Sequence, residues 1–297
     1  MAAALAGCAA KPASPAATTV TIPYVSPPRG ATRPAPVTPH LPAAAAAAQA
    51  AAVEHAVSDG QPIYCGRGHR RLVALTFDDG PGPDTATVVH QLRLAGAPAT
   101  FFLIARNVAR FPRSPRLERQ VGAIGDHTVT HPDLDLLGHA AARAQIAGGR
   151  SAALRAAGHP VTLFRPPYEA HDRWIDREVR RQGMAEILWD VDSTDTSSPA
   201  TDYHEIYRHV RHFARPGSIV LMHENRPQTV RALHAILPML RRRHLQPVTV
   251  PQLLAADPPS ATQLDAGYEG CQPGWRPPRA GHDRQARRPA RSRSRHE

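Results

Sequence analysis

This sequence of 297 residues contains a single lysine, Lys11, and few aromatic residues, which make up 5% of the chain. It has no apolar run close to the roughly 18 residues of a membrane-spanning helix, so no spanning segment is expected. The formal net charge of +11 would suit a nucleic-acid partner. However, much of the excess lies in the stretch 276–297, where no aromatic side chain stands between the arginines to stack on bases. The composition therefore argues against a specific nucleic-acid partner.

Only three cysteines are present, and the first lies near the N-terminus. Cys8 ends the sequence Leu-Ala-Gly-Cys, which resembles the lipobox of bacterial lipoproteins and precedes a Pro/Ala/Ser/Thr-rich stretch. The charged region of a signal peptide is missing, and the apolar run is shorter than the usual length of about 7 to 15 residues. We therefore predict a partial lipoprotein-type signal segment over 1–11, with the natural start upstream. A lipidated Cys8 would anchor the protein at the outer face of the membrane, in the cell envelope or outside the cell; the alternative is an incidental cysteine.

Composition divides the rest of the chain into three segments. Residues 12–62 are rich in Pro and Ala and are predicted to form a disordered linker, because they cannot bury enough apolar surface to offset the entropy of ordering. Residues 63–256 are predicted to form one globular domain, and 257–297 a flexible Arg/Pro-rich tail. Cys65 and Cys271 flank the domain and could pair in an oxidising compartment, which the sequence leaves open.

Strands alternate with helices throughout the globular segment. The expected strands lie near 72–77, 99–104, 123–125, 161–164, 185–191, 218–222 and 247–250. Helices are expected near 85–95, 117–121, 139–157, 174–181, 206–213 and 230–240. Such alternation predicts parallel strands with right-handed crossovers, in a distorted or incomplete (β/α) barrel of about seven strands. A doubly wound open sheet is the alternative, but the barrel is favoured because polar residues follow the strand ends, where barrel active sites gather.

The first strand ends in two adjacent acids, Asp78 and Asp79. Carboxylates at the tip of a buried strand are costly unless a cation compensates them, although a simple Asp-Asp-Gly-Pro turn is the alternative. His127 and His131 are four residues apart, so a helical turn would place both on one face, able to share an ion. Two imidazoles and the carboxylate of Asp79 make a catalytic zinc set with an open position, and they also suit cobalt, nickel or manganese. Asp78 would then be the base, because a metal-bound carboxylate loses basicity.

Five ordered motifs make this pattern specific. They read Thr76-Phe77-Asp78-Asp79-Gly80-Pro81, His127-Thr128-x-x-His131-Pro132, Arg165-Pro166-Pro167-Tyr168, Asp192-x-x-Asp195 and Leu221-Met222-His223. Together they resemble the motifs of the polysaccharide deacetylases, carbohydrate esterases of the NodB-homology type, over about 72–254. The resemblance implies that 63–256 is a catalytic domain that uses one divalent metal to hydrolyse N-acetyl groups of a polysaccharide, peptidoglycan first and chitin-type sugars next.

The resemblance also implies a role for each site residue. Asp78 resembles the general base of the family, and its metal ligands are matched by Asp79, His127 and His131. Arg165 resembles the residue that steadies the base, and His223 the general acid, with Asp195 as the carboxylate that keeps it protonated. The groove and acetyl-binding positions of the family are matched by Tyr168, whose backbone amide would help to hold the oxyanion, Pro166 and Leu221.

Two positions depart from the family pattern. Thr196 stands where the family usually has Trp, and Glu169 stands where it usually has Gly. The first change removes an aromatic groove wall, and the second places a Cβ atom and a charge in a tight turn. Both bear on substrate preference more than on chemistry. The alternatives are an acetylxylan O-deacetylase, a non-catalytic glycan-binding domain, and an unrelated metal hydrolase.

Overall fold

The computed structural model describes residues 42–198 and 201–274. The predicted signal segment with Cys8, most of the linker (12–41) and the stretch 275–297 lie outside these residues. Among the helices that are described, none combines the length and apolarity needed to cross a lipid bilayer.

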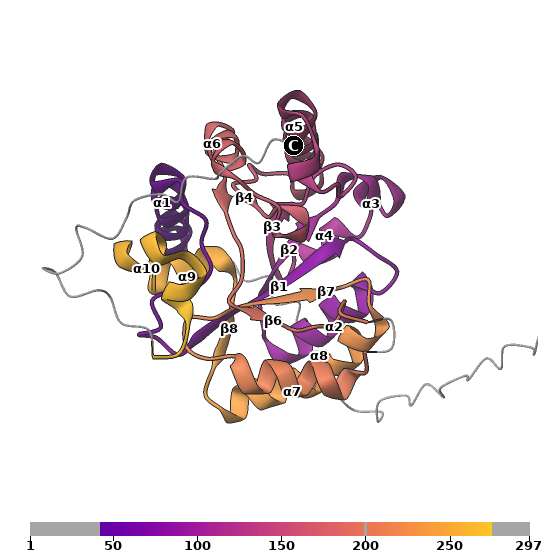
Figure 1. The fold of residues 1–297 in the computed structure, drawn as a ribbon. Coiled ribbons are helices and arrows are strands. Elements are labelled where there is room, and N and C mark those ends of the chain that lie inside the picture. The colour runs from indigo at the N-terminus through magenta and orange to yellow at the C-terminus, as the bar shows by residue number, and fades with distance from the viewer. Residues whose placement is uncertain (1–41, 199–200, 275–297) are drawn as a thin grey trace, which may run out of the picture. The chain divides into compact units, whose positions relative to one another are not determined.

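Eight parallel strands form one sheet in the described part of the chain. They are β1 (Leu72–Gly80), β2 (Ala99–Leu103), β3 (Gly122–Asp126), β4 (Leu163–Phe164), β5 (Ala185–Glu186), β6 (Val191–Asp192), β7 (Ile219–His223) and β8 (Gln246–Val248). The order is β5-β4-β3-β2-β1-β7-β6, and β8 pairs with β1 beyond this path. The two ends of the order, β5 and β6, are consecutive in the chain, so the sheet curls on itself without closing (Figure 1). The prediction of an incomplete parallel barrel is therefore confirmed over a doubly wound open sheet.

Helices surround the curled sheet (Figure 1). They are α1 (Ala43–Asp59), α2 (Thr85–Ala95), α3 (Ala105–Arg110), α4 (Pro115–Glu118), α5 (His139–Ala157), α6 (Arg173–Arg181), α7 (Tyr203–Phe213), α8 (Pro227–Arg242), α9 (Val250–Ala256) and α10 (Ala261–Ala266). Short 3₁₀ turns lie at Leu134–Leu136, Pro167–Glu169 and Gly267–Cys271. The helix expected near 117–121 ends at Glu118, and Val121 leads into β3 instead.

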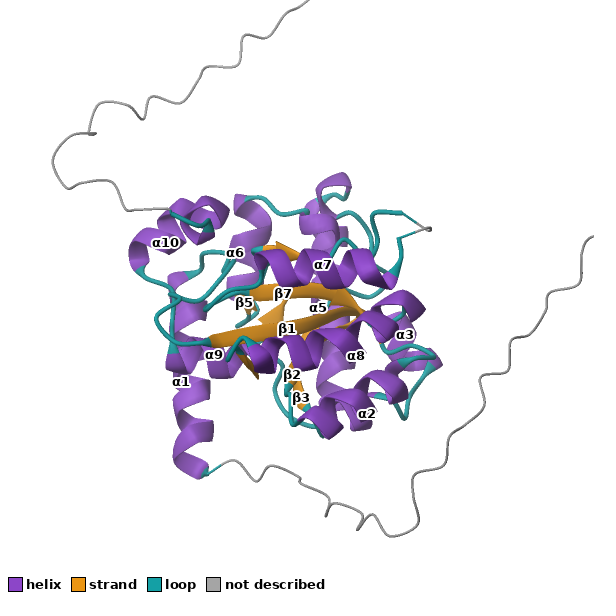
Figure 2. Cartoon of the chain, turned by 90° about the horizontal axis from the view of Figure 1, so that it is seen from below, coloured by secondary structure: helices purple, strands orange, loops and turns teal. Residues whose placement is uncertain are grey.

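The two faces of β1 have different surroundings, because side chains alternate along a strand. Val73, Leu75 and Phe77 belong to the hydrophobic core that includes buried residues of α2, α7 and α8. Figure 2 shows α2, α7 and α8 along this outer side of β1 and β7. The side chains of Thr76 and Asp78 lie on the opposite face of β1, toward the interior of the curled sheet. Side chains along β7 alternate in the same way. The pleat therefore turns the polar residues of β1 inward, at the end where the strand stops.

The predicted disordered linker is wrong for its last part, because 43–59 forms helix α1. Alanine has the highest helix propensity, and Gly60 ends the helix in the left-handed conformation at φ 64°. Val53 and Ala56 are buried in a core cluster shared with Leu253 and Leu254 of α9. This apolar contact adds tertiary stability to an alanine-rich segment that already favours a helix.

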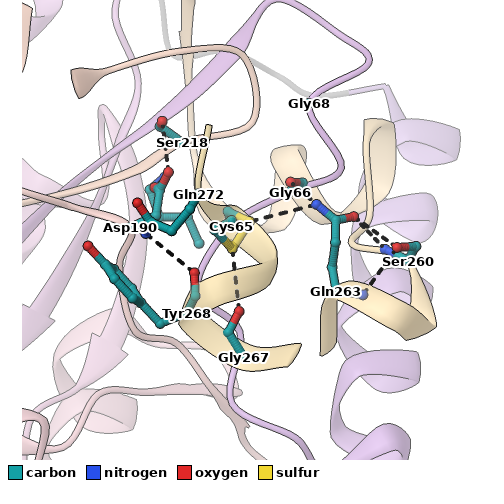
Figure 3. Close-up of a disulfide and its surroundings, with 12 residues drawn as sticks. Cys65, Gly66, Gly68, Asp190, Ser218, Ser260, Gln263, Gly267, Tyr268 and Gln272 are labelled. Carbon is teal, nitrogen blue, oxygen red and sulfur yellow. Dashed lines mark hydrogen bonds between the residues drawn. A yellow bond between two sulfur atoms is a disulfide. The ribbon is translucent and has the colours of Figure 1, made fainter. Parts of the chain in front are cut away.

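The predicted flexible tail is also wrong up to residue 274, because α10 and a 3₁₀ turn follow α9. A disulfide joins Cys65 to Cys271 across 206 residues of sequence and closes the domain near both ends (Figure 3). Asp257, expected to begin the tail, is buried, and its carboxylate accepts hydrogen bonds from the backbone of Gly68 and Arg70, each at 3.0 Å. The ordered domain thus extends beyond 63–256 in both directions.

The single strand expected at 185–191 is two short strands, β5 and β6. The turn between them keeps backbone hydrogen bonds, since the N–H groups of Ile187, Leu188 and Asp190 donate to the carbonyls of Phe164, Ile63 and Ile219, and it gains side-chain contacts as well. Asp190 accepts hydrogen bonds from the backbone N–H of Ile219 at 2.8 Å and from the Ser218 hydroxyl at 3.1 Å. The carbonyls of Ile187 and Leu188, at the start of the turn, accept hydrogen bonds from the buried guanidinium of Arg165.

Candidate active site

Strands β1 and β7 deliver the central acid and imidazole to one edge of the sheet. Their register pairs Thr76 with Leu221 and Asp78 with His223. Residues two apart on a strand share a face, so all four side chains lie on the inner side of the sheet. The carboxyl ends of parallel strands are the usual place for a (β/α) active site.

Asp78 is 3% exposed and is held by Arg165, which follows β4 and is fully buried. Arg165 Nη1 donates to Asp78 Oδ1 at 2.8 Å, and also to the hydroxyl of Thr76 at 2.8 Å. Its other two nitrogens donate to the carbonyls of Ile187 (2.9 Å, from Nε) and Leu188 (3.0 Å, from Nη2) in the turn between β5 and β6. The guanidinium therefore has one fixed position, and it keeps a permanent cation beside Asp78.

Burial lowers the pKa of Arg165, but the adjacent Asp78 carboxylate opposes that effect. The guanidinium remains protonated at neutral pH in proteins. Only one oxygen of Asp78 is taken by Arg165. The other, Oδ2, lies 3.7 Å from His127 Nε2, so it faces the cluster of metal-ligand types.

Asp79, His127 and His131 bring one carboxylate oxygen and two imidazole nitrogens within 4.8 Å of one another. Asp79 Oδ1 lies 3.2 Å from His131 Nε2 and 3.8 Å from His127 Nε2. This oxygen is buried and has no hydrogen-bond partner among the described residues, whereas Oδ2 accepts from Asn225 Nδ2 at 3.3 Å. A buried, unpartnered anionic oxygen facing two imidazoles fits a divalent metal ion.

The orientation of His127 leaves the correct nitrogen free for a metal ion. His127 Nδ1 lies 2.7 Å from the Arg165 carbonyl oxygen, which can only accept, so Nδ1 carries the proton and Nε2 is unprotonated in the neutral ring. A backbone carbonyl on the far nitrogen is the common way to fix a metal-binding tautomer. The same residue, Arg165, thus orients the acid Asp78 through its side chain and His127 through its backbone.

The two histidines do not lie on a helical turn, so that part of the sequence prediction is wrong. Residues 127–133 form an irregular loop after β3. Thr128 and His131 have left-handed φ values of 68° and 62°, and the His131 N–H donates to the Thr128 hydroxyl at 3.0 Å. Positive φ at residues with a Cβ atom is strained and often occurs at functional sites. The loop, rather than helical periodicity, brings the two rings to a centroid separation of 4.9 Å.

Charges in the cluster set the pKa values of its members. Burial raises the pKa of Asp79, but the imidazoles of His127, His223 and His131 outweigh it and hold the pKa below its usual range. Burial lowers the pKa of His131, which favours its neutral form. An ionised carboxylate and a neutral imidazole are the protonation states that metal ligands require.

A second buried carboxylate, Asp195, pairs with His223 instead of with an arginine. His223 Nδ1 donates to Asp195 Oδ1 at 2.8 Å, and the His223 backbone N–H donates to Oδ2 at 2.8 Å. Thr229 donates its hydroxyl to the same Oδ2 at 2.5 Å. Burial alone would lower the pKa of His223, but the hydrogen bond and charge of Asp195 raise it to about 9. The imidazole is therefore cationic at neutral pH, and its Nε2–H is not used by Asp195.

The three predicted groove residues, Tyr168, Leu221 and Pro166, differ in solvent exposure. Tyr168 is 69% exposed, and its ring packs edge-on against His131 at 4.7 Å between centroids. Leu221 is 5% exposed, and Pro166 is buried, so Pro166 shapes the loop rather than presenting an open surface. Tyr168 and Glu169 both have φ of 59°. The glycine that the family usually has at 169 would adopt this conformation without strain, whereas a glutamate at this position strains the backbone.

Several residues that support the site do not follow from the sequence pattern. Asp126 is fully buried, and its Oδ1 accepts from the Thr128 N–H at 2.8 Å at the start of the histidine loop. Burial raises its pKa well above the usual range. Gly149 of α5 packs against this turn, since a Cβ atom there would lie 2.0 Å from Asp126 Oδ1. Only the position of Asp126 directly before His127 hints at its role.

Parallel strands in an incomplete (β/α) barrel, with a buried acid, a cationic imidazole and a metal-ligand cluster at one edge, define the chain by class as a metal-dependent hydrolase. The particular family follows from comparison with known proteins. Residues 66–187 match the family described as polysaccharide deacetylase. A chitooligosaccharide deacetylase of Bradyrhizobium sp. is 35% identical over 202 residues, which cover 62% of this chain and 90% of that protein. The chain belongs to the polysaccharide deacetylase family.

Solved structures agree with this assignment. The crystal structure of a peptidoglycan N-acetylglucosamine deacetylase in complex with 4-naphthalen-1-yl-N-oxidanyl-benzamide has a TM-score of 0.63 and 27% identity, covering 68% of this chain and 97% of that one. A CE4-family pseudoenzyme from Bacillus anthracis has a TM-score of 0.61 and 26% identity, covering 65% and 68%. Since the fold accommodates a pseudoenzyme, activity has to be argued from the site residues.

Proposed function

We propose that this protein hydrolyses N-acetyl groups on a polysaccharide of amino sugars and releases acetate. The observation that carries the proposal is that two differently partnered groups, Asp78 and His223, lie opposite each other on adjacent strands at the edge that holds the Asp79–His127–His131 cluster. Asp78 is an acceptor held by Arg165, and His223 is a donor held by Asp195. Amide hydrolysis needs both a base for water and an acid for the leaving nitrogen.

The ligand set Asp79, His127 and His131 fits a single divalent ion, and we propose zinc, with cobalt, nickel or manganese also suited to these ligands. When bound, such an ion supplies Lewis-acid polarisation of the acetyl carbonyl and acidifies a water molecule. The chain's own part is to keep the three ligands converged and unprotonated, which the tautomer of His127 and the lowered pKa of Asp79 support.

Asp78 serves as the general base in this proposal. Its Oδ2 is not hydrogen-bonded to Arg165 and faces the ligand cluster, so it can accept a proton from water as the water oxygen attacks the acetyl carbon. Arg165 holds the carboxylate in position and stabilises its charge. The Tyr168 backbone N–H, in the turn beside His131, is the proposed donor to the oxyanion.

His223 serves as the general acid. As the carbon–nitrogen bond breaks, Nε2–H gives its proton to the departing nitrogen, so the amine leaves neutral and acetate remains. Asp195 keeps the imidazole charged and fixes its Nδ1 face. Leu221, two residues before His223 on the same side of β7, is the proposed apolar contact for the acetyl methyl group.

Peptidoglycan and chitin-type oligomers are the proposed substrates. The similar proteins described above are named for N-acetylglucosamine in peptidoglycan and for chitooligosaccharides. We further propose a location outside the cytoplasm, supported by the Cys65–Cys271 disulfide, because such bonds persist mainly in oxidising compartments. Anchoring through a lipidated Cys8 remains part of this proposal and rests on the sequence alone.

The proposal is tested by measuring acetate release from zinc-loaded protein with N-acetylglucosamine oligomers, purified peptidoglycan and acetylated xylan. We expect release from at least one amino-sugar substrate. Release from xylan alone would replace the proposal with an O-deacetylase. Binding to the glycans without acetate release from any of them would make the chain a non-catalytic glycan-binding domain.

A further inference from the structure

A second cluster of metal-ligand side chains lies on β5, α6 and the segment between Tyr168 and α6. His171 Nδ1 is 3.0 Å from Asp176 Oδ1 and 3.5 Å from Glu186 Oε1. One ligand atom from each of the three residues lies within 4.8 Å of the others. None of these residues belongs to the catalytic motifs, so the proposed reaction gives no reason for the arrangement.

Glu186 is the most buried residue of the cluster. It is 5% exposed, and neither of its carboxylate oxygens has a hydrogen-bond partner among the described residues. Its one ion-pair contact in that part of the chain is His171 Nδ1. That nitrogen carries at most one proton, and Asp176 is nearer to it than Glu186. A protonated His171 therefore cannot satisfy both carboxylates.

Nearby acids outnumber the one imidazole that acts on Glu186. Burial raises the pKa of Glu186 to about 8, His171 opposes this, and Asp176 and Asp172 raise it further. Glu169 is a third nearby acid, since it interacts with both His171 and Tyr64. A buried carboxylate in this setting either takes up a proton or binds a cation.

We propose that His171, Asp176 and Glu186 bind a second divalent cation of the zinc class, separate from the catalytic ion. Ligand atoms bonded to tetrahedral zinc at about 2.1 Å are roughly 3.4 Å apart. The separations of 3.0 and 3.5 Å around His171 Nδ1 bracket that value, as do the 3.2 and 3.8 Å around Asp79 Oδ1 in the first cluster. One imidazole and two carboxylates complete a three-residue set that leaves a position for water.

The second ring nitrogen of His171 is already engaged in a way that suits this role. The Tyr64 hydroxyl lies 3.4 Å from His171 Nε2, so it can accept the proton that Nε2 carries when Nδ1 binds a cation. A bound ion would connect β5 and the first turn of α6 to the segment that follows Tyr168. The site would therefore hold the turn that carries the proposed oxyanion donor, without touching the substrate itself.

The test is zinc stoichiometry, measured by elemental analysis after equilibration with zinc and removal of free metal. We expect two zinc ions per chain in the wild type and one in Glu186→Gln, which keeps the shape of the side chain. His171→Asn should give the same loss. Glu205→Gln, on the exposed side of α7, is the matched control and should keep two ions.

The double variant His127→Ala/His131→Ala removes the first cluster and isolates the second. It should retain one zinc ion, and added zinc should raise its melting temperature; adding Glu186→Gln should abolish both effects. One zinc ion in the wild type, or an unchanged content in Glu186→Gln, would overturn the proposal and leave His171 as a plain ion-pair partner. Circular dichroism on every variant separates loss of the ion from loss of the fold.

Discussion

Asp78 and Asp195 are two buried carboxylates at the same edge of the sheet, yet their partners give them opposite uses. Asp78 accepts from Arg165, a cation that does not release its proton at physiological pH. Asp195 accepts from His223, whose proton can be transferred because its pKa of about 9 is within reach of the operating pH. The same residue type therefore becomes a base in one place and a support for an acid in the other.

The remaining contacts reinforce the difference. Asp195 accepts three hydrogen bonds, one at Oδ1 from the His223 ring and two at Oδ2 from the Thr229 hydroxyl and the His223 backbone N–H. Asp78 has one oxygen tied to Arg165 and one facing the metal-ligand cluster. The number of accepted hydrogen bonds thus separates the supporting carboxylate from the reactive one.

The largest effect is expected for Asp78→Asn, which removes the base but keeps the shape of the side chain. The amide cannot take a proton from water, so kcat for acetate release should fall by about 10³- to 10⁴-fold. Elemental analysis should show an unchanged metal content, because Asp79, His127 and His131 are intact. Asp59→Asn at the end of α1 is the matched control and should keep full activity. A variant that retains the wild-type rate would remove Asp78 from the mechanism.

His223→Gln removes the proposed general acid. It should lower kcat by about 10²- to 10³-fold, which is less than Asp78→Asn, because water can still protonate the leaving nitrogen slowly. A substrate with an activated leaving group, such as a phenyl acetate ester, needs little help from an acid. The variant should therefore lose much less activity on the ester than on the N-acetyl sugar. Equal losses on both substrates would indicate a structural role for His223 instead.

Arg165→Leu removes the cation beside Asp78 and leaves a buried carboxylate without its partner. Loss of one member of a buried pair costs about 3 to 5 kcal/mol of stability. Urea denaturation should show this decrease, while Arg231→Leu, on the exposed side of α8, should change stability little. An unchanged midpoint for Arg165→Leu would mean that the four donated hydrogen bonds do not hold the site together.

The sequence predicts most of the fold and the site because motif residues sit at the ends of apolar strands. Alternating strands and helices predict the parallel sheet, and the Asp-Asp pair marks its functional edge. The split of 185–191 into β5 and β6 is not predictable, because it depends on Arg165 and Asp190 bonding backbone groups far away in sequence. Helix α1 lies in a stretch assigned to the linker from its overall Pro/Ala content, although its proline-free alanine run favours a helix and burial of Val53 and Ala56 against α9 adds tertiary stability.

The geometry of the site also depends on tertiary contacts that the sequence pattern does not predict. Residue types and spacing give the ligands, but the loop that carries His127 and His131 has left-handed residues that no periodicity indicates. Asp126 and Gly149 support that loop through a tertiary contact between β3 and α5. Thr229 donates to Asp195 from the first turn of α8, shortly after the last motif but outside its pattern. Local patterns thus identify the reacting groups, whereas the groups that position them appear only with the tertiary structure.

The smallest effect on chemistry is expected for the double variant Cys65→Ser/Cys271→Ser. Cys65 of the disulfide (Figure 3) pairs with Ser218, directly before the start of β7, whereas His223 lies at the other end of that strand, so kcat of the folded protein should stay within about twofold. Loss of a native disulfide typically costs about 2 to 5 kcal/mol, which urea denaturation would measure. A large drop in kcat without loss of stability would show that the disulfide acts on the site.

The pairing of His223 with Asp195 can be tested by the pH dependence of kcat/KM for acetate release in the wild type and in Asp195→Asn. Asp195 raises the pKa of His223 to about 9, and the acid is lost when the pH rises through that value. The wild type should therefore lose activity near pH 9, and Asp195→Asn should lose it at lower pH, toward the ordinary histidine value of about 6.5. Coincident alkaline limbs in the two proteins would contradict the assignment of His223 as an acid tuned by Asp195.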